Sequence, residues 1–183
     1  MFIERGYAAS SMEQVAQRAG AGKQTIYRRY PSKRWLFAAV LEDLGGGLST
    51  GATLDQSASS DPLAGLREVC RATLEANTKP ETIAIYRVLI AESQRFPKLV
   101  EHTVNRITEP LTGLLRRLIT AARQRGQIRR DVDVEQCVRG LTGLINGWVL
   151  RQGMLGRRSL SSDAERSAFL ESAWTIFLEG VTE

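Results

Sequence analysis

The chain has 183 residues, 43% of them hydrophobic, so it can bury a core without help from disulfides or metals. Its formal net charge is +5, of which the first 45 residues carry +3 with seven basic and four acidic side chains. Two cysteines without a CxxC spacing and a single histidine argue against a disulfide framework or a metal site. The chain lacks an 18-residue apolar run and carries charged residues already at positions 4 and 5, so we expect a cytoplasmic protein with no membrane segment.

Three helices are predicted in the first 44 residues. Ser11 with Gln14 forms a capping-box pattern, and this first complete helix ends at Gly20. Its expected buried positions are Met12, Val15, Ala16 and Ala19. After a short turn, a second helix covers residues 23–30. Ser32 caps a third helix that runs from about Lys33 to Leu44.

The rest of the chain is also predicted to be helical, because no stretch alternates cleanly between apolar and polar residues. Asp61 and Pro62 open a region of three or four helices that ends near Gly126. Within it, Pro80, Pro97 and Pro110 mark helix starts or breaks. The last two helices have their own caps: Asp133 with Gln136, and Ser162 with Glu165.

These elements define an all-α fold with two domains. Residues 1–44 form a small N-terminal helix-turn-helix domain, and residues 62–183 form a larger helical domain. Residues 45–61 are rich in Gly, Ser and Thr, which predicts a flexible linker.

The predicted helix over residues 23–30 divides into an apolar face and a polar face. At about 100° per residue, Ile26 and Tyr30 lie about 40° apart and form the apolar face. Between Glu13 and Glu42 the chain carries six basic residues and no acid. A cluster of basic residues without acids on a short second helix favours binding to a polyanion such as DNA, in which the side chains of the helix can reach base edges. The alternative is an ordinary solvated face, but such faces normally contain interspersed acids.

The same segment resembles a known family. The matching residues are 2–7 (Phe-Ile-Glu-Arg-Gly-Tyr), 11–16 (Ser-Met-Glu-Gln-Val-Ala), 19–20 (Ala-Gly), 23–28 (Lys-Gln-Thr-Ile-Tyr-Arg), 30–33 (Tyr-Pro-Ser-Lys) and 36–37 (Leu-Phe). They closely resemble the DNA-binding domain of TetR/AcrR transcriptional regulators, without a gap over roughly the first 44 residues. Residues 90–97 and 125–129 look like the ligand domains of the family's multidrug-type regulators.

The resemblance implies roles for individual side chains. Lys23, Gln24, Thr25 and Tyr27 would face the DNA groove. Arg28 and Arg29 would contact phosphate or bases, and Lys33 would contact a phosphate from the start of the next helix. The resemblance also implies a homodimer on a palindromic operator, released by a small, largely apolar effector.

Three positions depart from the family pattern. Gly22 stands where the family often has serine, so a helix cap is lost. Gln24 stands where glycine is common, and its amide can bond an adenine edge, with discrimination of about 1–3 kcal/mol. The family's first helix usually begins well before the counterpart of Phe2, so most of that helix is missing from this sequence.

Two apolar helices near the C-terminus indicate a subunit interface or simple core packing. Residues 134–155 contain Trp148 and three glycines, Gly140, Gly143 and Gly147, that lie close to one side of the predicted helix. The last helix offers an apolar face from Phe169 to Phe177. The composition favours neither interpretation. The resemblance favours the interface, because the last two helices of each protomer in the family form a four-helix bundle across a two-fold axis.

Polar side chains in apolar surroundings are candidates for a ligand cavity. These candidates are Tyr86, Gln94, Asn105, Asn146 and Trp148. No nucleophile with a base, no metal-ligand spacing and no phosphate loop appears in the sequence, so we expect neither an enzyme nor a cofactor. The leading hypothesis is a ligand-responsive repressor. The alternative is a helical small-molecule-binding protein without competent DNA binding.

Overall fold

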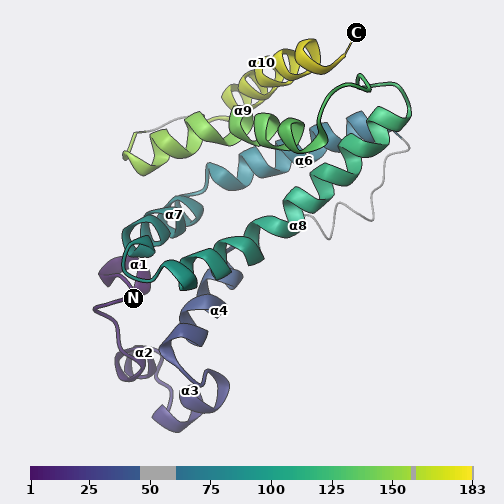
Figure 1. The fold of residues 1–183 in the computed structure, drawn as a ribbon. Helices are drawn as coiled ribbons and strands as arrows, with labels where there is room; N and C mark the ends of the chain where they lie inside the picture. The colour runs from purple at the N-terminus through teal and green to yellow at the C-terminus, as the bar shows by residue number, and fades with distance from the viewer. Residues whose placement is uncertain (46–60, 158–159, 183) are drawn as a thin grey trace.

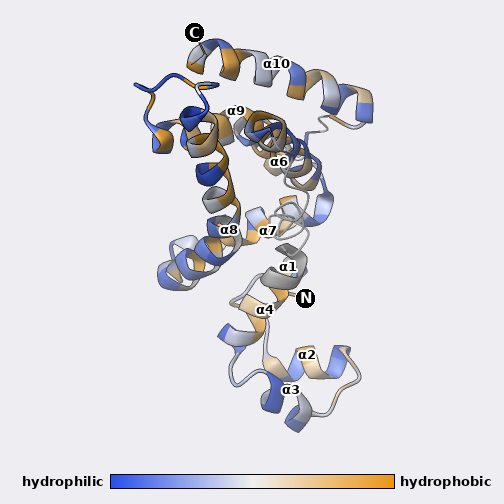
Figure 2. Ribbon diagram, turned by 90° about the vertical axis from the view of Figure 1, so that its right-hand side faces the viewer, coloured by the Kyte–Doolittle hydropathy of each residue, from blue (hydrophilic) through white to orange (hydrophobic). Residues whose placement is uncertain are grey.

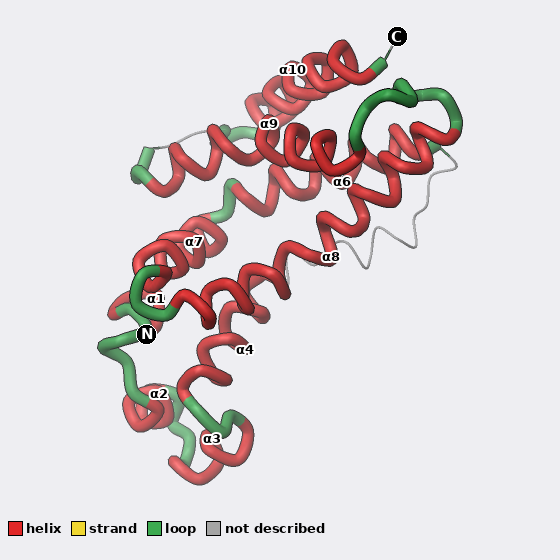
Figure 3. Tube along the Cα trace, in the orientation of Figure 1, coloured by secondary structure: helices red, strands yellow, loops and turns green. Residues whose placement is uncertain are grey.

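The computed structural model describes residues 1–45, 61–157 and 160–182. Within these ranges the chain forms nine α-helices and no strand, so the all-α prediction is confirmed (Figure 3). The N-terminal helices are α1 (Phe2–Arg5), α2 (Met12–Arg18), α3 (Lys23–Arg29) and α4 (Lys33–Gly45). The C-terminal helices are α6 (Pro62–Asn77), α7 (Pro80–Ser93), α8 (Pro97–Gln124), α9 (Val134–Met154) and α10 (Asp163–Val181). The predicted linker lies almost wholly outside the described residues.

The molecule is elongated (Figure 1). Helices α2 and α3 lie at one end, and α9 and α10 lie at the other. The long helix α8 runs between the two ends. No helix in the described ranges combines the length and hydropathy needed to cross a membrane.

Local sequence signals explain most helix starts. Ser11 accepts a hydrogen bond from the backbone N–H of Gln14 at 3.2 Å, and the Gln14 side chain accepts from Ser11 N, so the predicted capping box is present. Ser162 and Glu165 form a second capping box at α10. Each box satisfies two backbone donors that a helix start leaves unpaired.

Three further predicted helix boundaries are also present. Asp61 caps α6 with Pro62 at its first position, and Asp133 caps α9 by accepting from Gln136 N at 2.9 Å. At the end of α8, Gly126 adopts a φ of +74°, a left-handed conformation that glycine adopts without steric cost.

Two expectations about helices were wrong. Pro110 neither starts nor breaks a helix, because α8 continues through it as 28 residues. The tertiary packing of α8 therefore outweighs the backbone hydrogen bond that a proline removes. Ala19 was expected to be buried but is exposed, because it is the residue that caps the end of α2; Met12 and Ala16 are the buried residues of that helix.

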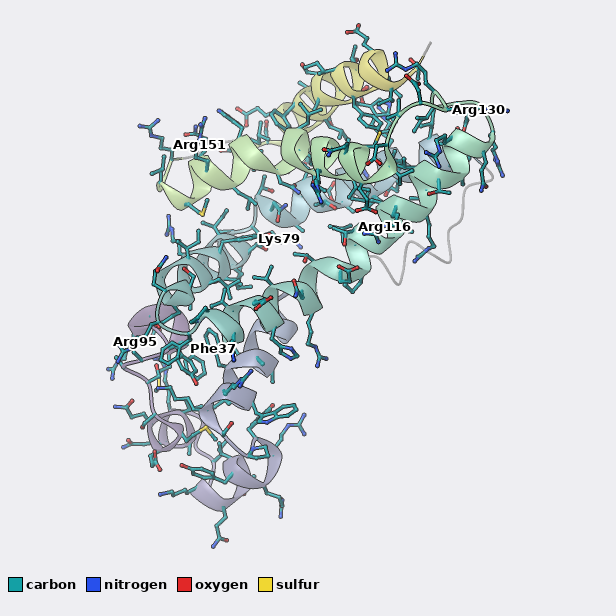
Figure 4. All side chains as sticks on the ribbon, viewed as in Figure 1. Phe37, Lys79, Arg95, Arg116, Arg130 and Arg151 are labelled. Atoms are coloured by element: carbon teal, nitrogen blue, oxygen red, sulfur yellow. The ribbon has the colours of Figure 1, made fainter. Side chains whose placement is uncertain are left out.

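The N-terminal helices share a core with α7. Its buried members are Phe2, Tyr7, Met12, Leu36, Phe37, Ile85, Val88 and Leu89. Phe37 has no exposed surface, and its ring lies 4.8 Å from that of Tyr7 and 5.2 Å from that of Phe2. Figure 4 shows Phe37 at the junction of α4 with the C-terminal helices. The short α1 thus contributes an aromatic ring to this core.

The C-terminal helices have a second, larger core. Its buried members come from α6, α8, α9 and α10, together with Ile128 between α8 and α9. Leu170, Ala173, Trp174 and Phe177 belong to it. The apolar face of the last helix, considered for a subunit interface, therefore lies mostly inside the protomer.

Candidate nucleic-acid interface and effector cavity

Helix α3 presents its polar face to solvent. None of the seven residues Lys23–Arg29 is buried, and Ile26 and Tyr30 are half-buried against the N-terminal core. The exposed residues are Lys23, Gln24, Thr25, Tyr27, Arg28 and Arg29. In the hydropathy view, α3 appears mostly hydrophilic at the tip of the molecule (Figure 2). The helix can therefore enter a groove without unpacking the domain.

A carboxylate on α2 holds two of these side chains. Glu13 Oε1 lies 3.0 Å from Lys23 Nζ and accepts a hydrogen bond from the Tyr27 hydroxyl at 3.0 Å. The hydrogen bond from Lys23, and secondarily bonds from its own backbone and from Tyr27, lower the pKa of Glu13 to about 2. Glu13 therefore stays ionised at neutral pH and places a negative charge beside the polar face of α3. The sequence showed only that Glu13 borders the basic stretch.

Arg29 and Lys33 have partners within the protein. Arg29 Nε donates to the Tyr30 hydroxyl at 3.1 Å. Lys33 Nζ donates to the Ala8 carbonyl at 3.1 Å and lies 4.5 Å from the centre of the Tyr7 ring. Desolvation lowers the pKa of Lys33. A phosphate contact by Lys33 would compete with both of these contacts.

The C-terminal helices line a cavity of about 200 Å³ that is partly open to solvent. Its lining residues come from α6, α7, α8 and α9: Thr73, Asn77, Tyr86, Thr108, Leu111, Thr112, Thr142 and Asn146. Asn77 Nδ2 donates to Asn146 Oδ1 at 2.7 Å, which links α6 to α9 across the cavity wall. Burial raises the pKa of the Tyr86 hydroxyl, so it is a protonated donor at neutral pH.

Two of the five predicted ligand residues line this cavity and three do not. Tyr86 and Asn146 are in the lining. Gln94 and Asn105 are exposed, and Trp148 is 43% exposed on α9, where its ring stacks on Phe169 at 5.8 Å. The threonines and Asn77 were missed, although polar residues on the apolar face of a helix are a signal that could have identified them.

Glu92 connects the two groups of helices. This residue of α7 is buried, and its Oε1 accepts from the backbone N–H groups of Tyr7 at 2.8 Å and Ala8 at 3.3 Å. A Cβ atom at Gly6, where φ is +78°, would lie only 3.1 Å from that oxygen. The same helix carries Tyr86 in the cavity wall. Helix α7 therefore contacts both the cavity, through Tyr86, and the N-terminal helices, through Glu92.

Helices α9 and α10 also have exposed apolar surface. Ile176 on α10 is 55% exposed, and Trp148 on α9 is 43% exposed. Gly140, Gly143 and Gly147 are exposed, and a Cβ added to any of them would meet nothing within 4 Å. This surface, unlike the buried side of α10, is open to a partner.

Two family profiles match the chain. The profile of the TetR family of bacterial regulatory proteins matches residues 1–40. The profile of the C-terminal domain of AefR-like transcriptional repressors matches residues 64–180. Together they cover the exposed helix α3, the cavity and the α9–α10 surface.

Individual relatives agree with this result. The transcriptional activator FasR of Mycolicibacterium smegmatis is 34% identical over 76 residues, which are 42% of this chain and 33% of FasR. The transcriptional regulator YvkB of Bacillus subtilis is 23% identical over 185 residues, covering 100% of this chain and 92% of YvkB. A crystal structure of a TetR-family regulator from Mesorhizobium loti superposes with a TM-score of 0.79 at 23% identity, covering 100% and 91% of the two chains.

The profile over residues 64–180 spans more than half of the chain, and the fold agrees with it from end to end. The chain belongs to the TetR family of DNA-binding transcriptional regulators, which are not enzymes.

Proposed function

We propose that this regulator is a homodimeric repressor that a small molecule releases from a palindromic operator. The observation that carries the proposal is the polar face of α3, which is exposed to solvent at the tip of the molecule. In this proposal residues 1–44 bind DNA, residues 62–183 bind the effector and the partner subunit, and residues 45–61 join them. Acting on chromosomal DNA, the protein would work in the cytoplasm.

Each α3 would enter the major groove of one half-site. Lys23, Gln24, Thr25 and Tyr27 would face the groove. Arg28 and Arg29 would contact phosphates or bases, and Lys33 would contact a phosphate. Glu13 must release Lys23 and Tyr27 when DNA arrives, which favours sites whose contacts replace both hydrogen bonds. Gln24 would add preference for adenine at one position per half-site.

The effector would act through α7. A molecule in the cavity touches Tyr86, and the same helix holds Tyr7 and Ala8 through Glu92. A ligand shifts the equilibrium between two states only if it binds one of them better than the other. We infer that the effector favours a position of α7 in which the two α3 helices no longer match the half-site spacing of about 34–36 Å.

Operator selection tests the DNA-binding part of this proposal. Purified protein is mixed with genomic fragments, bound fragments are sequenced, and the affinity for the recovered site is measured between roughly 50 and 200 mM salt. Affinity is expected to fall by orders of magnitude over that range, because several phosphates are neutralised. Gln24→Ala is expected to relax base preference at one position. Salt-independent binding, or no enriched site, would favour the alternative of a small-molecule-binding protein.

The dimer has its own test. Ile176→Arg is expected to give a monomer in light scattering and to abolish operator binding, because the side chain lies on the open α10 surface. Ile90→Arg is the matched control, since Ile90 is equally exposed but lies on α7. Leu170→Arg is unsuitable for this purpose, because Leu170 belongs to the protomer's own core. A monomeric unmodified protein at micromolar concentration would contradict the proposed dimer.

A further inference from the structure

The cavity wall is rich in hydrogen-bond acceptors. Four of its threonine hydroxyls donate to the backbone carbonyl four residues earlier in the same helix. The donor–acceptor pairs are Thr73 to Val69 (2.7 Å), Thr108 to Val104 (2.9 Å), Thr112 to Thr108 (3.1 Å) and Thr142 to Val138 (2.7 Å). A hydroxyl has a single proton, so each of these oxygens offers only lone pairs to a molecule in the cavity.

Asn77 adds an acceptor that lacks a partner. The residue is 1% exposed, and its Nδ2 is fixed by the hydrogen bond to Asn146. Its Oδ1 is buried and finds no hydrogen-bond partner in the part of the chain that the structure describes. Buried polar atoms are almost always paired, so this unpaired oxygen indicates a missing donor. Because the oxygen itself has almost no accessible surface, a donor in the cavity reaches it when the Asn77 side chain rotates.

The wall also lacks charge. None of its eight described lining residues is an acid, a lysine, an arginine or a histidine. A charged molecule would lose its hydration here without a counter-charge. A carboxylate is further disfavoured, because it brings only acceptors to a wall whose donors are limited to the Tyr86 hydroxyl and the asparagine amides. The volume of about 200 Å³ lies below the usual range of about 300–1,000 Å³ for drug-sized ligands.

We propose that the effector is a small, uncharged phenol whose hydroxyl groups donate hydrogen bonds to Asn77 Oδ1 and to the threonine oxygens. Leu111 and Tyr86 supply the contacts to its ring, and Leu111 also lines the small apolar void next to the cavity. This inference rests on the proposed role of the cavity as the effector site. It disfavours carboxylates and long acyl chains as ligands of this wall.

Direct binding to the full chain tests the inference without DNA. Resorcinol serves as the probe, and 1,3-dimethoxybenzene and benzoate are the comparators. Dimethoxybenzene keeps the ring and both oxygens but has no donor, and benzoate keeps the ring but is an anion. Calorimetry is expected to show resorcinol binding at least about tenfold tighter than either comparator, the size of effect that one or two buried hydrogen bonds give.

Variants locate the site. Thr142→Val and Asn77→Leu each replace an acceptor by a group of similar shape, and each is expected to weaken resorcinol binding roughly five- to tenfold. Thr82→Val is the matched control, because Thr82 is buried on α7 but does not line the cavity. Circular dichroism checks that each variant is folded. If Asn77→Leu does not fold, Thr142→Val alone decides the test.

The outcomes separate the ligand from the regulator. Equal binding of dimethoxybenzene, tighter binding of benzoate, or unchanged binding by Thr142→Val overturns the phenol inference. Absence of operator binding by the unliganded protein overturns the proposed function and leaves the calorimetric result intact. Resorcinol that releases the operator from the unmodified protein, but not from Thr142→Val, supports both.

Discussion

The two hydrophobic cores of this protein do not follow the order of its chain. The larger core is built from α6, α8, α9 and α10, all of them C-terminal helices. The smaller core combines α1, α2 and α4 with Ile85, Val88 and Leu89 of α7, so a helix of the C-terminal region completes the N-terminal core. The helices that carry α3 therefore depend on α7 for their packing, and α7 also forms part of the cavity wall.

This difference gives a physical route for regulation. A movement of α7 changes the packing of the smaller core directly, whereas the larger core can keep its own contacts. The consequence is that damage to the two cores, and to the link between them, should have separable effects.

The largest effect is expected from Phe37→Ala, compared with Ile119→Ala. Both side chains are completely buried, one in each core, and their loss costs about 3–5 and 2–5 kcal/mol of unfolding free energy, respectively. Phe37→Ala should abolish operator binding while most helical signal survives, because the larger core stays intact. Ile119→Ala should lower the melting temperature of the whole molecule. Thermal unfolding followed by circular dichroism, together with operator titration, distinguishes the two variants. If both variants lowered the melting temperature of the whole molecule alike, the two-core description would be contradicted.

Glu92→Leu removes the hydrogen bonds that join α7 to the N-terminal helices. The substitution leaves the buried backbone N–H of Tyr7 and the partly buried N–H of Ala8 without this acceptor, at a cost of about 1–3 kcal/mol. We expect operator affinity to fall about tenfold or more and the response to the effector to shrink. Glu92→Gln keeps an acceptor oxygen and should be milder. Glu81→Gln, on the exposed first turn of the same helix, is the control, and an equal effect there would argue against the link.

Glu13→Gln tests the surface of the N-terminal helices. Replacing the carboxylate by an amide weakens its hydrogen bonds to Lys23 and Tyr27 and removes a negative charge near DNA, so operator affinity should rise about two- to fivefold at pH 7. Glu4→Gln is the control, because Glu4 pairs with Arg18 and not with α3. Unchanged or weaker binding by Glu13→Gln would show that Glu13 does not restrain these residues.

The contribution of Glu13 to the stability of the folded state depends on pH with a definite sign. The folded-state pKa of Glu13 is about 2, against 4.5 for an ordinary glutamate. A lowered carboxyl pKa stabilises the folded state above pH 4.5, and this contribution is lost as the pH falls from 4.5 towards 2. Titration of the Glu13 carboxyl by NMR should give its midpoint well below pH 4, and a midpoint near 4.5 would mean that the contacts do not persist in solution.

The smallest effect is expected from Gly22→Ser. Gly22 is the N-cap of α3 with a φ of −62° and no side-chain cap, and a Cβ there would meet only Thr25 Oγ1 at 3.7 Å. A serine cap should add a few tenths of a kcal/mol and raise the melting temperature by about 1 °C. Gly20→Ser is the contrast, because Gly20 has a φ of +63° and a side chain there is strained. Equal effects at the two glycines would contradict this assignment of the cap.

The sequence by itself determined most of the helix boundaries, the polar face of α3 and the family. Capping residues such as Ser11 and Asp133 act within three residues of themselves, so their hydrogen bonds follow from local order. The helical period also decided that Ile26 and Tyr30 face inward. A resemblance spread over contiguous residues needs no tertiary information.

Only the tertiary structure decided which helices meet. Asn77 and Asn146 are 69 residues apart, and Glu92 and Tyr7 are 85 residues apart, yet the first pair forms a partly buried hydrogen bond and the second a buried one. A periodic pattern shows that one side of a helix is apolar, but it does not name the helix that covers it. For the same reason the sequence could not place Trp148 at the surface and Leu170 in the core, because both lie on helices whose apolar residues exceed what one neighbour can bury.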